Sequence, residues 1–284
     1  MQSQDWSYTD TGTGQPIVLL HGLGADATAW DRIVPELSSA HRVIAVDLPG
    51  YSLRTAVEDV PHARELADGL DSLLADLGIE SAVLMGHSLG GTICLMVADR
   101  HPRRCLGLVL IAPGGFGTEL NPVLPLLSTR LGAQLLERLY GTRASRTIER
   151  LAARVESRPV RDSRVRIVEL METYDRLRSE RARAQFRSSV RRTLALNAGP
   201  DRSRLSELDP TIPILVVWGR EDRVLPVWHA KNATATLPWS TVRVLDGVGH
   251  TPHRSHPYQV ARLVADFVTS DAVRHRGELS RPGS

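Results

Sequence analysis

Cysteine and long apolar stretches are scarce in this 284-residue sequence, and each shortage narrows the class of protein. The two cysteines, Cys94 and Cys105, lie in apolar segments without metal-ligand spacing, so buried free thiols in a reducing compartment are expected. No apolar run approaches the length that spans a bilayer. The first 16 residues lack the basic and apolar regions of a secretory signal. We therefore expect a cytoplasmic protein without a membrane partner.

Lysine is nearly absent: Lys231 is the only one, and arginine supplies the remaining Lys and Arg charge. The formal net charge is +3, yet residues 130–192 contain 17 arginines and 8 acidic residues, a local excess of +9. No nucleic-acid recognition motif accompanies this basic segment, so no nucleic-acid partner is expected. The excess fits either a solvated helix surface or electrostatic steering of an anionic substrate.

Six short apolar runs, each ending in a turn signal, predict buried strands. They are residues 16–22, 41–50, 81–88, 105–114, 212–220 and 240–250. Their nearly continuous Val, Ile and Leu is typical of strands covered on both faces, as in a parallel sheet. Residues 6–16 come first and predict an antiparallel edge strand that turns at Gly12 and Gly14.

Helical patterns separate these runs and predict an α/β fold with a doubly wound, mostly parallel sheet. The expected helices cover residues 28–40, 61–78, 88–102, 225–238 and 255–270. In the second of these, leucines at helical spacing form a single stripe, and Gly78 follows as the residue that ends the helix.

The alternation of strands and helices stops at about residue 116 and resumes at about residue 200. Between them, arginine-rich helical patterns at 121–139, 145–157, 160–177 and 180–196 predict an all-helical cap inserted into the sheet domain. The predicted organisation is an N-terminal core part at 1–115, the cap at 116–200, a C-terminal core part at 201–272 and a disordered tail at 273–284.

Residues 85–92, MGHSLGGT, place Ser88 between glycines in the pattern Gly-x-Ser-x-Gly. A predicted strand precedes the motif and a predicted helix follows it, which is the context of a nucleophile elbow. In such an elbow the sharp turn holds the hydroxyl clear of the sheet, close to the N-terminus of a helix that favours negative charge. Ser88 is therefore the candidate nucleophile.

A nucleophilic serine needs a base, and His250 directly follows the last apolar run. It is expected at the carboxyl edge of the sheet, level with the elbow. His253 and His256 lie further along and are expected at the surface or the rim of a pocket. His87 is expected to point away from the site, and a solvated surface position is expected for the other histidines.

The base in turn needs an orienting acid, and Asp222 lies in the loop after the preceding strand run. Glu221 is the adjacent competitor, whereas Asp246 lies inside the final run and is less well placed. Backbone N–H groups must also stabilise a tetrahedral intermediate. The loop His21-Gly22-Leu23-Gly24 and the elbow predict an oxyanion hole formed by the N–H groups of Leu23 and Leu89.

The motifs HGLG, DLPG, GHSLGG, WGRED and GVGH, taken together, resemble those of the α/β-hydrolase fold serine hydrolases that carry a helical cap. The resemblance covers about residues 6–270. It implies an eight-stranded sheet, a pocket between sheet and cap, and the order Ser88, Asp222, His250 for the three catalytic residues. The family often has a second glycine in the DLPG loop where this sequence has Ser52, and Asp47 of that loop is expected to be structural.

The expected reaction is acyl transfer to water from a carboxylic ester, lactone or thioester, with no metal or organic cofactor. The partner is then a small-molecule acyl substrate, which includes anionic and carrier-bound acyl groups. Meta-cleavage C–C hydrolases keep the same three residue types, but Thr251 follows His250 where that group typically has tryptophan. An acyltransferase or cyclase, and a non-catalytic ligand-binding protein on the same fold, are the remaining alternatives.

Overall fold

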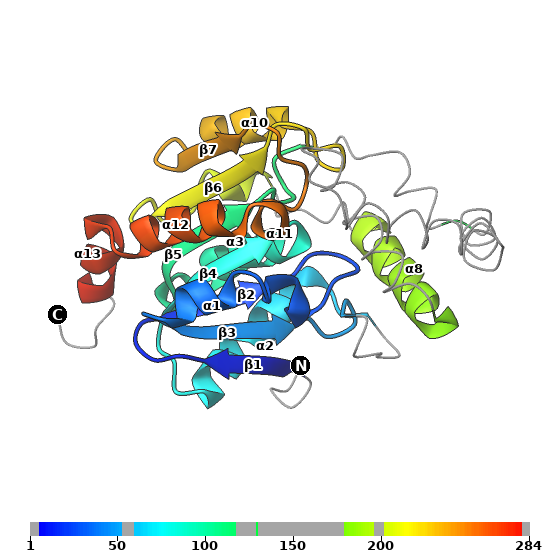
Figure 1. The fold of residues 1–284 in the computed structure, drawn as a ribbon, viewed down its shortest axis with the longest axis horizontal. Coiled ribbons are helices and arrows are strands. Elements are labelled where there is room, and N and C mark those ends of the chain that lie inside the picture. The colour runs from blue at the N-terminus through cyan, green and yellow to red at the C-terminus, as the bar shows by residue number, and fades with distance from the viewer. Residues whose placement is uncertain (1–5, 53–59, 118–128, 130–178, 196–201, 280–284) are drawn as a thin grey trace, which may run out of the picture.

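One seven-stranded sheet forms the centre of the computed structural model, which describes residues 6–52, 60–117, 129, 179–195 and 202–279 (Figure 1). The strands are β1 (Ser7–Thr11), β2 (Pro16–Leu20), β3 (Arg42–Asp47), β4 (Ala82–His87), β5 (Cys105–Ile111), β6 (Ile214–Gly219) and β7 (Thr241–Leu245). Their order across the sheet is β1-β3-β2-β4-β5-β6-β7.

Every neighbouring pair in the sheet is parallel except the first, because β1 runs antiparallel to β3. The predicted antiparallel edge strand and the mostly parallel, doubly wound sheet are thus confirmed. The expectation of eight strands is wrong for the described residues, which supply seven. The eighth strand came from the family resemblance alone; the apolar runs together with the edge strand account for seven.

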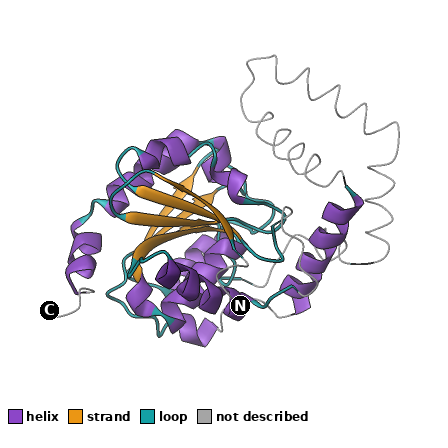
Figure 2. Ribbon diagram, turned by 90° about the horizontal axis from the view of Figure 1, so that it is seen from below, coloured by secondary structure: helices purple, strands orange, loops and turns teal. Residues whose placement is uncertain are grey.

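Helices cover both faces of the sheet (Figure 2). They are η2 (Ala27–Trp30), α1 (Val34–Ser38), α2 (Ala63–Asp76), α3 (Leu89–Arg100), η3 (Pro102–Arg104), α8 (Glu180–Ala195), α9 (Arg202–Leu205), α10 (Trp228–Thr236), α11 (Pro252–Ser255), α12 (Pro257–Val268) and α13 (Asp271–Leu279). Among these described helices, none combines the length and apolarity needed to cross a membrane.

Each face of the sheet carries its own apolar core, because successive strand residues point to opposite sides. Leucines 66, 70, 73 and 74 of α2 pack with α3 and α10 on one face. Residues of η2, α1, α12 and α13 pack on the other. Both cysteines are buried, as predicted, and burial raises the pKa of the Cys105 thiol to about 12.

The chain leaves neighbouring strands toward opposite faces at two places. After β2 it enters η2 and α1 on one face, whereas after β4 it enters α3 on the other. After β6 it enters α10, whereas after β7 it enters α12 on the opposite face. In parallel sheets, ligand sites form where the connections diverge in this way, outside the carboxyl ends of the strands. All the candidate site residues follow β2, β4, β6 or β7.

The predicted cap is described mainly through α8, which matches the helix expected at 180–196. Figure 1 shows α8 beyond the edge at which the parallel strands end, on the opposite side of the sheet from α13. The cap helices expected at 121–139, 145–157 and 160–177 lie outside the described residues.

The prediction of a disordered tail at 273–284 is wrong for its first part, because α13 extends to Leu279. Val273 is buried against the core. The Arg276 guanidinium is also buried and donates to the carbonyls of Cys105 and Pro102 and to the carboxylate of Asp209. A single buried arginine can anchor a polar helix in this way, and hydropathy alone does not reveal it. Residues 280–284 lie outside the described part of the chain.

Candidate active site

Ser88 occupies the single-residue junction between β4 and α3. Its backbone angles are φ 52° and ψ −113°, a left-handed conformation that costs a non-glycine residue about 1–3 kcal/mol. The strain is held in place because the Ser88 N–H donates to the carbonyl of Ile111 at 2.9 Å, while the Ser88 carbonyl accepts from Thr92 at 3.1 Å. Ser88 remains partly exposed between fully buried strand and helix residues. The local fold therefore leaves the Ser88 side chain accessible while its neighbours in the chain are buried.

Glycine at position 90 lets the first turn of α3 lie directly against β2. A Cβ on Gly90 would stand only 2.1 Å from the carbonyl oxygen of Leu20, so no other residue fits there without a shift of the backbone. This close approach draws the end of β2, and the His21–Gly24 loop after it, toward the serine.

Asp222 and His250 form a hydrogen-bonded pair at the ends of β6 and β7. His250 Nδ1 lies 2.7 Å from Asp222 Oδ2, and the Asp222 side chain is completely buried. The other carboxylate oxygen of Asp222 accepts from the N–H groups of Val224 and Leu225 at 2.8 and 2.9 Å. Since the carboxylate only accepts, Nδ1 of His250 is the donor, and in the neutral form of the ring Nε2 is then the nitrogen that carries the lone pair.

The loop with His250 reaches the end of β4 although three strand positions separate β4 from β7, a span of roughly 14 Å at the usual strand spacing. The loop after β7 crosses this distance along the sheet edge. His87 Nε2 lies 2.9 Å from the backbone oxygen of His250, and the two rings are 4.8 Å apart between centroids. His250 therefore contacts the residue next to Ser88.

The two competing carboxylates have other positions. Glu221 is exposed, and Asp246 is exposed and paired with Arg220. Of the three acidic residues weighed from the sequence, Asp222 alone bonds to His250 in the structure.

The two residues predicted to supply the oxyanion donors lie at the start of α3 and on the loop after β2. Leu89 is the first residue of α3, and first-turn N–H groups have no acceptor within their own helix. Leu23 lies on the loop after β2, where a Cβ on Gly22 would stand 3.3 Å from Ser88 Cβ. This spacing places the loop that carries Leu23 against Ser88.

Hydrogen bonds between the loop after β2, which carries Leu23, and the 47–52 loop after β3 restrain both loops. The Leu48 N–H donates to His21 Nε2 at 2.9 Å, so His21 Nδ1 carries the proton and faces the Gly22 carbonyl at 2.8 Å. Ser52, which replaces the family's glycine, is buried and donates to Asp47 at 3.1 Å. Asp47 also accepts from the Ala27 N–H at 2.8 Å, which agrees with a structural role.

Several histidines expected at the surface are buried instead. His253, expected at the surface or a pocket rim, is fully buried, with its ring 4.5 Å from Trp30 and 4.6 Å from His87. His21, His41 and His229 are buried too. Histidine has an apolar ring that packs well when its polar atoms are satisfied, so its burial depends on neighbours that sequence position does not reveal.

Helix α8 packs on the loops that follow β2 and β3. Gln185 and Ser189 both donate to the carbonyl of Gly50, Ser189 at 3.1 Å. Phe186 and Val190 form a small apolar cluster with Leu23. The described part of the predicted cap thus contacts the same residue whose N–H is the candidate oxyanion donor.

Sequence comparison relates this arrangement to known proteins. The family model described as the alpha/beta hydrolase fold matches residues 15–257. A protein named 2-hydroxy-6-oxononadienedioate/2-hydroxy-6-oxononatrienedioate hydrolase from Burkholderia vietnamiensis is 34% identical over 274 residues, which cover 92% of this chain and 90% of its own length.

Comparison of structures gives similar folds. A thermophilic esterase from Thermogutta terrifontis superposes with a TM-score of 0.68 at 26% identity, over 93% of this chain and 92% of its own. A meta-cleavage product hydrolase from Pseudomonas fluorescens superposes with a TM-score of 0.72 at 22% identity, over 92% of this chain and 93% of its own. The second likeness concerns the fold alone.

Proposed function

Because the chain belongs to the alpha/beta hydrolase fold family, we propose that this hydrolase cleaves a carboxylic ester, lactone or thioester through an acyl-enzyme on Ser88. The observation that carries the proposal is the Asp222–His250 hydrogen bond. It commits Nδ1 of the imidazole to the buried carboxylate, so Nε2 is the nitrogen that would act as the base for the strained, partly exposed serine, whose neighbour His87 contacts His250.

In the proposed reaction, Ser88 Oγ attacks the acyl carbon while Nε2 of His250 takes the hydroxyl proton. Asp222 holds the ring and stabilises the imidazolium that forms. The N–H groups of Leu23 and Leu89 donate to the oxyanion, where the N-terminus of α3 adds a favourable dipole. His250 then gives the proton to the leaving group, and water releases the acyl group by the same steps in reverse.

The nucleophile is tested by the substitution Ser88→Ala. A fluorophosphonate probe should label the native protein at Ser88, and the variant should lose both labelling and turnover of p-nitrophenyl esters. Removal of one triad member commonly leaves only about 10³–10⁴-fold catalysis over water. Ser72→Ala, at an exposed serine on α2, is the matched control and should label normally. Covalent labelling that persists in folded Ser88→Ala protein would exclude Ser88 as the nucleophile.

Hydrolysis of a carbon–carbon bond is the second candidate, and the relative from Burkholderia vietnamiensis favours it through its name and 34% identity. Meta-cleavage hydrolases use the same three residue types, so the catalytic geometry serves either reaction. What separates the candidates is the substrate: the C–C reaction needs a vinylogous diketone whose leaving group is a carbon acid.

A competition between two chromogenic substrates decides between these candidates. The purified protein is offered p-nitrophenyl acetate and butyrate on one side and 2-hydroxy-6-oxo-6-phenylhexa-2,4-dienoate on the other. Ester hydrolysis predicts that kcat/KM for the better ester exceeds that for the dienoate, with both rates abolished in Ser88→Ala. A kcat/KM for the dienoate at least 100-fold above that of either ester would transfer the assignment to C–C hydrolysis.

A further inference from the structure

His87 is buried beneath the candidate site, in a place that the proposed chemistry does not use. It ends β4, and strand alternation puts its side chain on the same face as Val83 and Met85, opposite to α3. The ring lies 4.8 Å from His250 and 4.6 Å from His253 between centroids. The sequence predicted that this side chain points away from the site. In the structure its ring contacts the ring of His250 instead.

The contact to His250 defines which nitrogen of His87 carries the proton. The backbone oxygen of His250 can only accept, so His87 Nε2, 2.9 Å away, donates. Burial, followed by the neighbouring His253 and His250, holds the pKa of His87 well below its ordinary value, so the ring is neutral and Nδ1 carries no proton. Arg254 is the remaining charged group that lowers this pKa.

The opposite edge of the ring meets the loop after β2. A Cβ on Gly22 would stand 2.6 Å from His87 Nδ1, so the backbone there follows the surface of the imidazole. His87 therefore contacts the oxyanion loop on one side and the His250 loop on the other, and is joined by a peptide bond to Ser88. One rigid side chain thus links all three candidate catalytic segments.

The loop that carries His250 needs such a restraint. It crosses from β7 to the end of β4, and it contains Gly247 and Gly249, which give its backbone wide conformational freedom. Asp222 holds the imidazole, and the Glu221 N–H donates to the Val248 carbonyl at 3.0 Å, so these two contacts tie the loop to the segment after β6. The hydrogen bond from His87 instead ties the backbone oxygen of His250 to β4, the strand that ends next to Ser88.

The geometry points to His87 as a positioning residue for the hydrolysis proposed above, one whose Nε2–H holds the His250 backbone and keeps that imidazole in register with Ser88. The inference rests on the proposed function for its kinetic consequence. Its structural consequence, the restraint of the loop, stands without it.

The test compares two substitutions that differ in one hydrogen bond. Gln can place an amide N–H near the position of Nε2, whereas Leu fills similar space without a donor, so His87→Gln should rescue what His87→Leu loses. His41→Leu is the control, because His41 is also buried but precedes β3, at the opposite end of the sheet. Circular dichroism and thermal unfolding establish that each variant folds.

Two readouts are expected to move together. In His87→Leu, hydrogen exchange of the amides in residues 246–250 should accelerate by about tenfold or more, and His87→Gln should stay within about threefold of the native rate. For the better ester, kcat should fall about 10- to 100-fold in His87→Leu with KM changed less than about threefold, because small misplacements of a catalytic group cost rate rather than binding.

Each alternative result has a defined meaning. Unchanged exchange in folded His87→Leu overturns the inference, and so does equal acceleration in both variants, since ring packing alone would then explain it. A protein that neither labels with fluorophosphonate nor cleaves esters refutes the proposed function, while the exchange comparison still decides the role of His87.

Discussion

At the scale of single residues, Asp222 is the most constrained group of the site. Its Oδ1 receives two backbone N–H groups and its Oδ2 receives His250, so three donors fix a fully buried carboxylate. The two backbone donors belong to the turn that follows β6. The loop that carries Asp222 therefore orients its carboxylate independently of the hydrogen bond from His250.

This arrangement predicts a large effect of Asp222→Asn. The two backbone donors should retain the amide oxygen, so the NH₂ group would face His250 Nδ1 and force the proton of the ring onto Nε2, where the base is needed. We expect kcat to fall by roughly 10⁴-fold with KM nearly unchanged, as when an orienting acid is lost from a triad. Steady-state kinetics on an ester measure this.

Glu221→Gln is the matched control for that substitution, because Glu221 is adjacent and exposed. It should change kcat less than about twofold, as is usual for a surface substitution away from the chemistry. A larger loss in Glu221→Gln than in Asp222→Asn would mean that the wrong carboxylate has been assigned.

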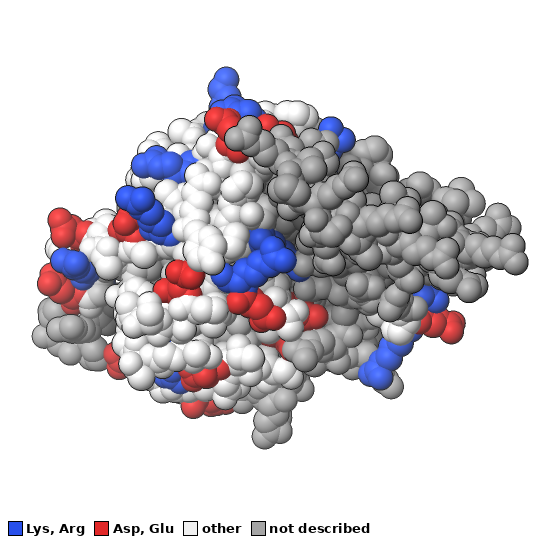
Figure 3. Space-filling model, viewed as in Figure 1, with Lys and Arg blue, Asp and Glu red and all other residues white. Residues whose placement is uncertain are grey.

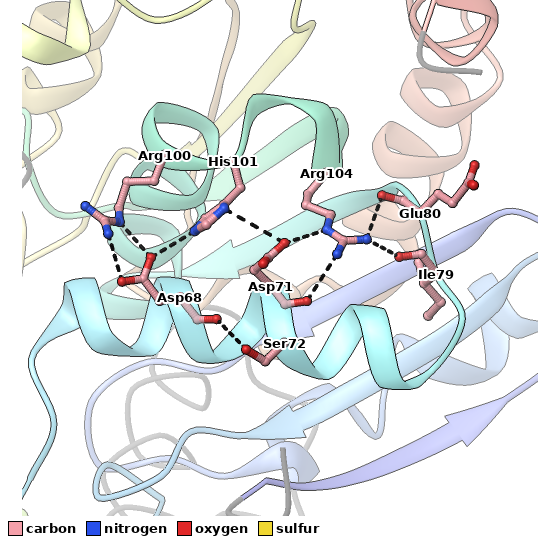
Figure 4. Close-up of polar contacts among 8 residues, drawn as sticks. All are labelled: Asp68, Asp71, Ser72, Ile79, Glu80, Arg100, His101 and Arg104. Atoms are coloured by element: carbon pink, nitrogen blue, oxygen red, sulfur yellow. Dashed lines mark hydrogen bonds and ion pairs between the residues drawn. The ribbon is translucent and has the colours of Figure 1, made fainter. Parts of the chain in front are cut away.

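At the scale of elements, a polar network ties α2 to the end of the elbow helix α3 (Figure 4). Arg100 donates to both oxygens of Asp68 at 2.8 Å, and His101 Nε2 lies 2.8 Å from the same carboxylate. Arg104 pairs with Asp71 and donates to the Ile79 carbonyl at 2.8 Å. The network fastens the end of α3 that is remote from Ser88.

The network predicts an acid-sensitive contribution to stability. The hydrogen bond from Arg100, followed by that from His101, holds the pKa of Asp68 below its ordinary value. A carboxylate with a lowered pKa stabilises the fold above its unfolded pKa, near pH 4, and this stabilisation is lost as the pH falls through the folded value. Asp68 is nearly half exposed, so Asp68→Asn should cost at most about 1 kcal/mol at pH 7.

Urea unfolding of both proteins at pH 7 and pH 3 measures this contribution. The difference in free energy of unfolding between native protein and Asp68→Asn should be present at pH 7 and shrink at pH 3. Asp76→Asn, an exposed position at the end of the same helix, should show little difference at either pH. A difference for Asp68→Asn that is the same at both pH values would contradict the ionic origin.

Helix α13 makes a second prediction at this scale. Arg276 is buried and donates to two backbone carbonyls and to Asp209, so Arg276→Met should leave these acceptors without their donor. The expected loss is about 2 kcal/mol in the free energy of unfolding, because hydrogen bonds to charged groups are worth about 1.5–3 kcal/mol. The exposed Arg274→Met is the control, and equal midpoints for the two variants in chemical denaturation would refute the anchoring role.

At the scale of the whole molecule, positive charge is concentrated in one segment of the chain. Figure 3 shows acidic and basic side chains interspersed over the described part of the face in view. The excess of +9 lies in residues 130–192, of which the structure describes 179–192 on α8. That helix stands beyond the edge of the sheet where Ser88 and His250 lie, so its arginines are on the same side of the molecule as the candidate site.

If this positive segment attracts substrate, the rate should depend on salt. For an anionic ester, kcat/KM should fall as ionic strength rises, because the field is screened over a Debye length of about 8 Å at physiological salt. A neutral ester of the same acyl group should respond little. Measuring kcat/KM for both esters between 20 mM and 500 mM sodium chloride tests this. An equal response of the two esters would mean that the arginines form an ordinary solvated surface and do not attract substrate.

The local sequence was sufficient for the elements and for the principal motif. Continuous Val, Ile and Leu predicted the parallel strands, leucine spacing predicted α2, and Gly-x-Ser-x-Gly between strand and helix predicted the strained serine. These features depend on interactions within about ten residues, so periodicity and turn chemistry reveal them. The positions of Asp222 and His250 after successive strands also followed, because parallel strands end at one edge.

Only the tertiary structure decided which side chains from distant segments meet. No local pattern connects the residues that meet in four contacts: His87 with His250, His253 with Trp30, α8 with the Leu23 loop, and Arg276 of α13 with the Cys105 carbonyl. Hydropathy misplaced the buried histidines and the tail because it scores a polar side chain alone, whereas burial of such a group depends on the hydrogen-bond partner it finds. The partner is supplied by the topology of the sheet, which brings the loops after β2, β4, β6 and β7 to one edge.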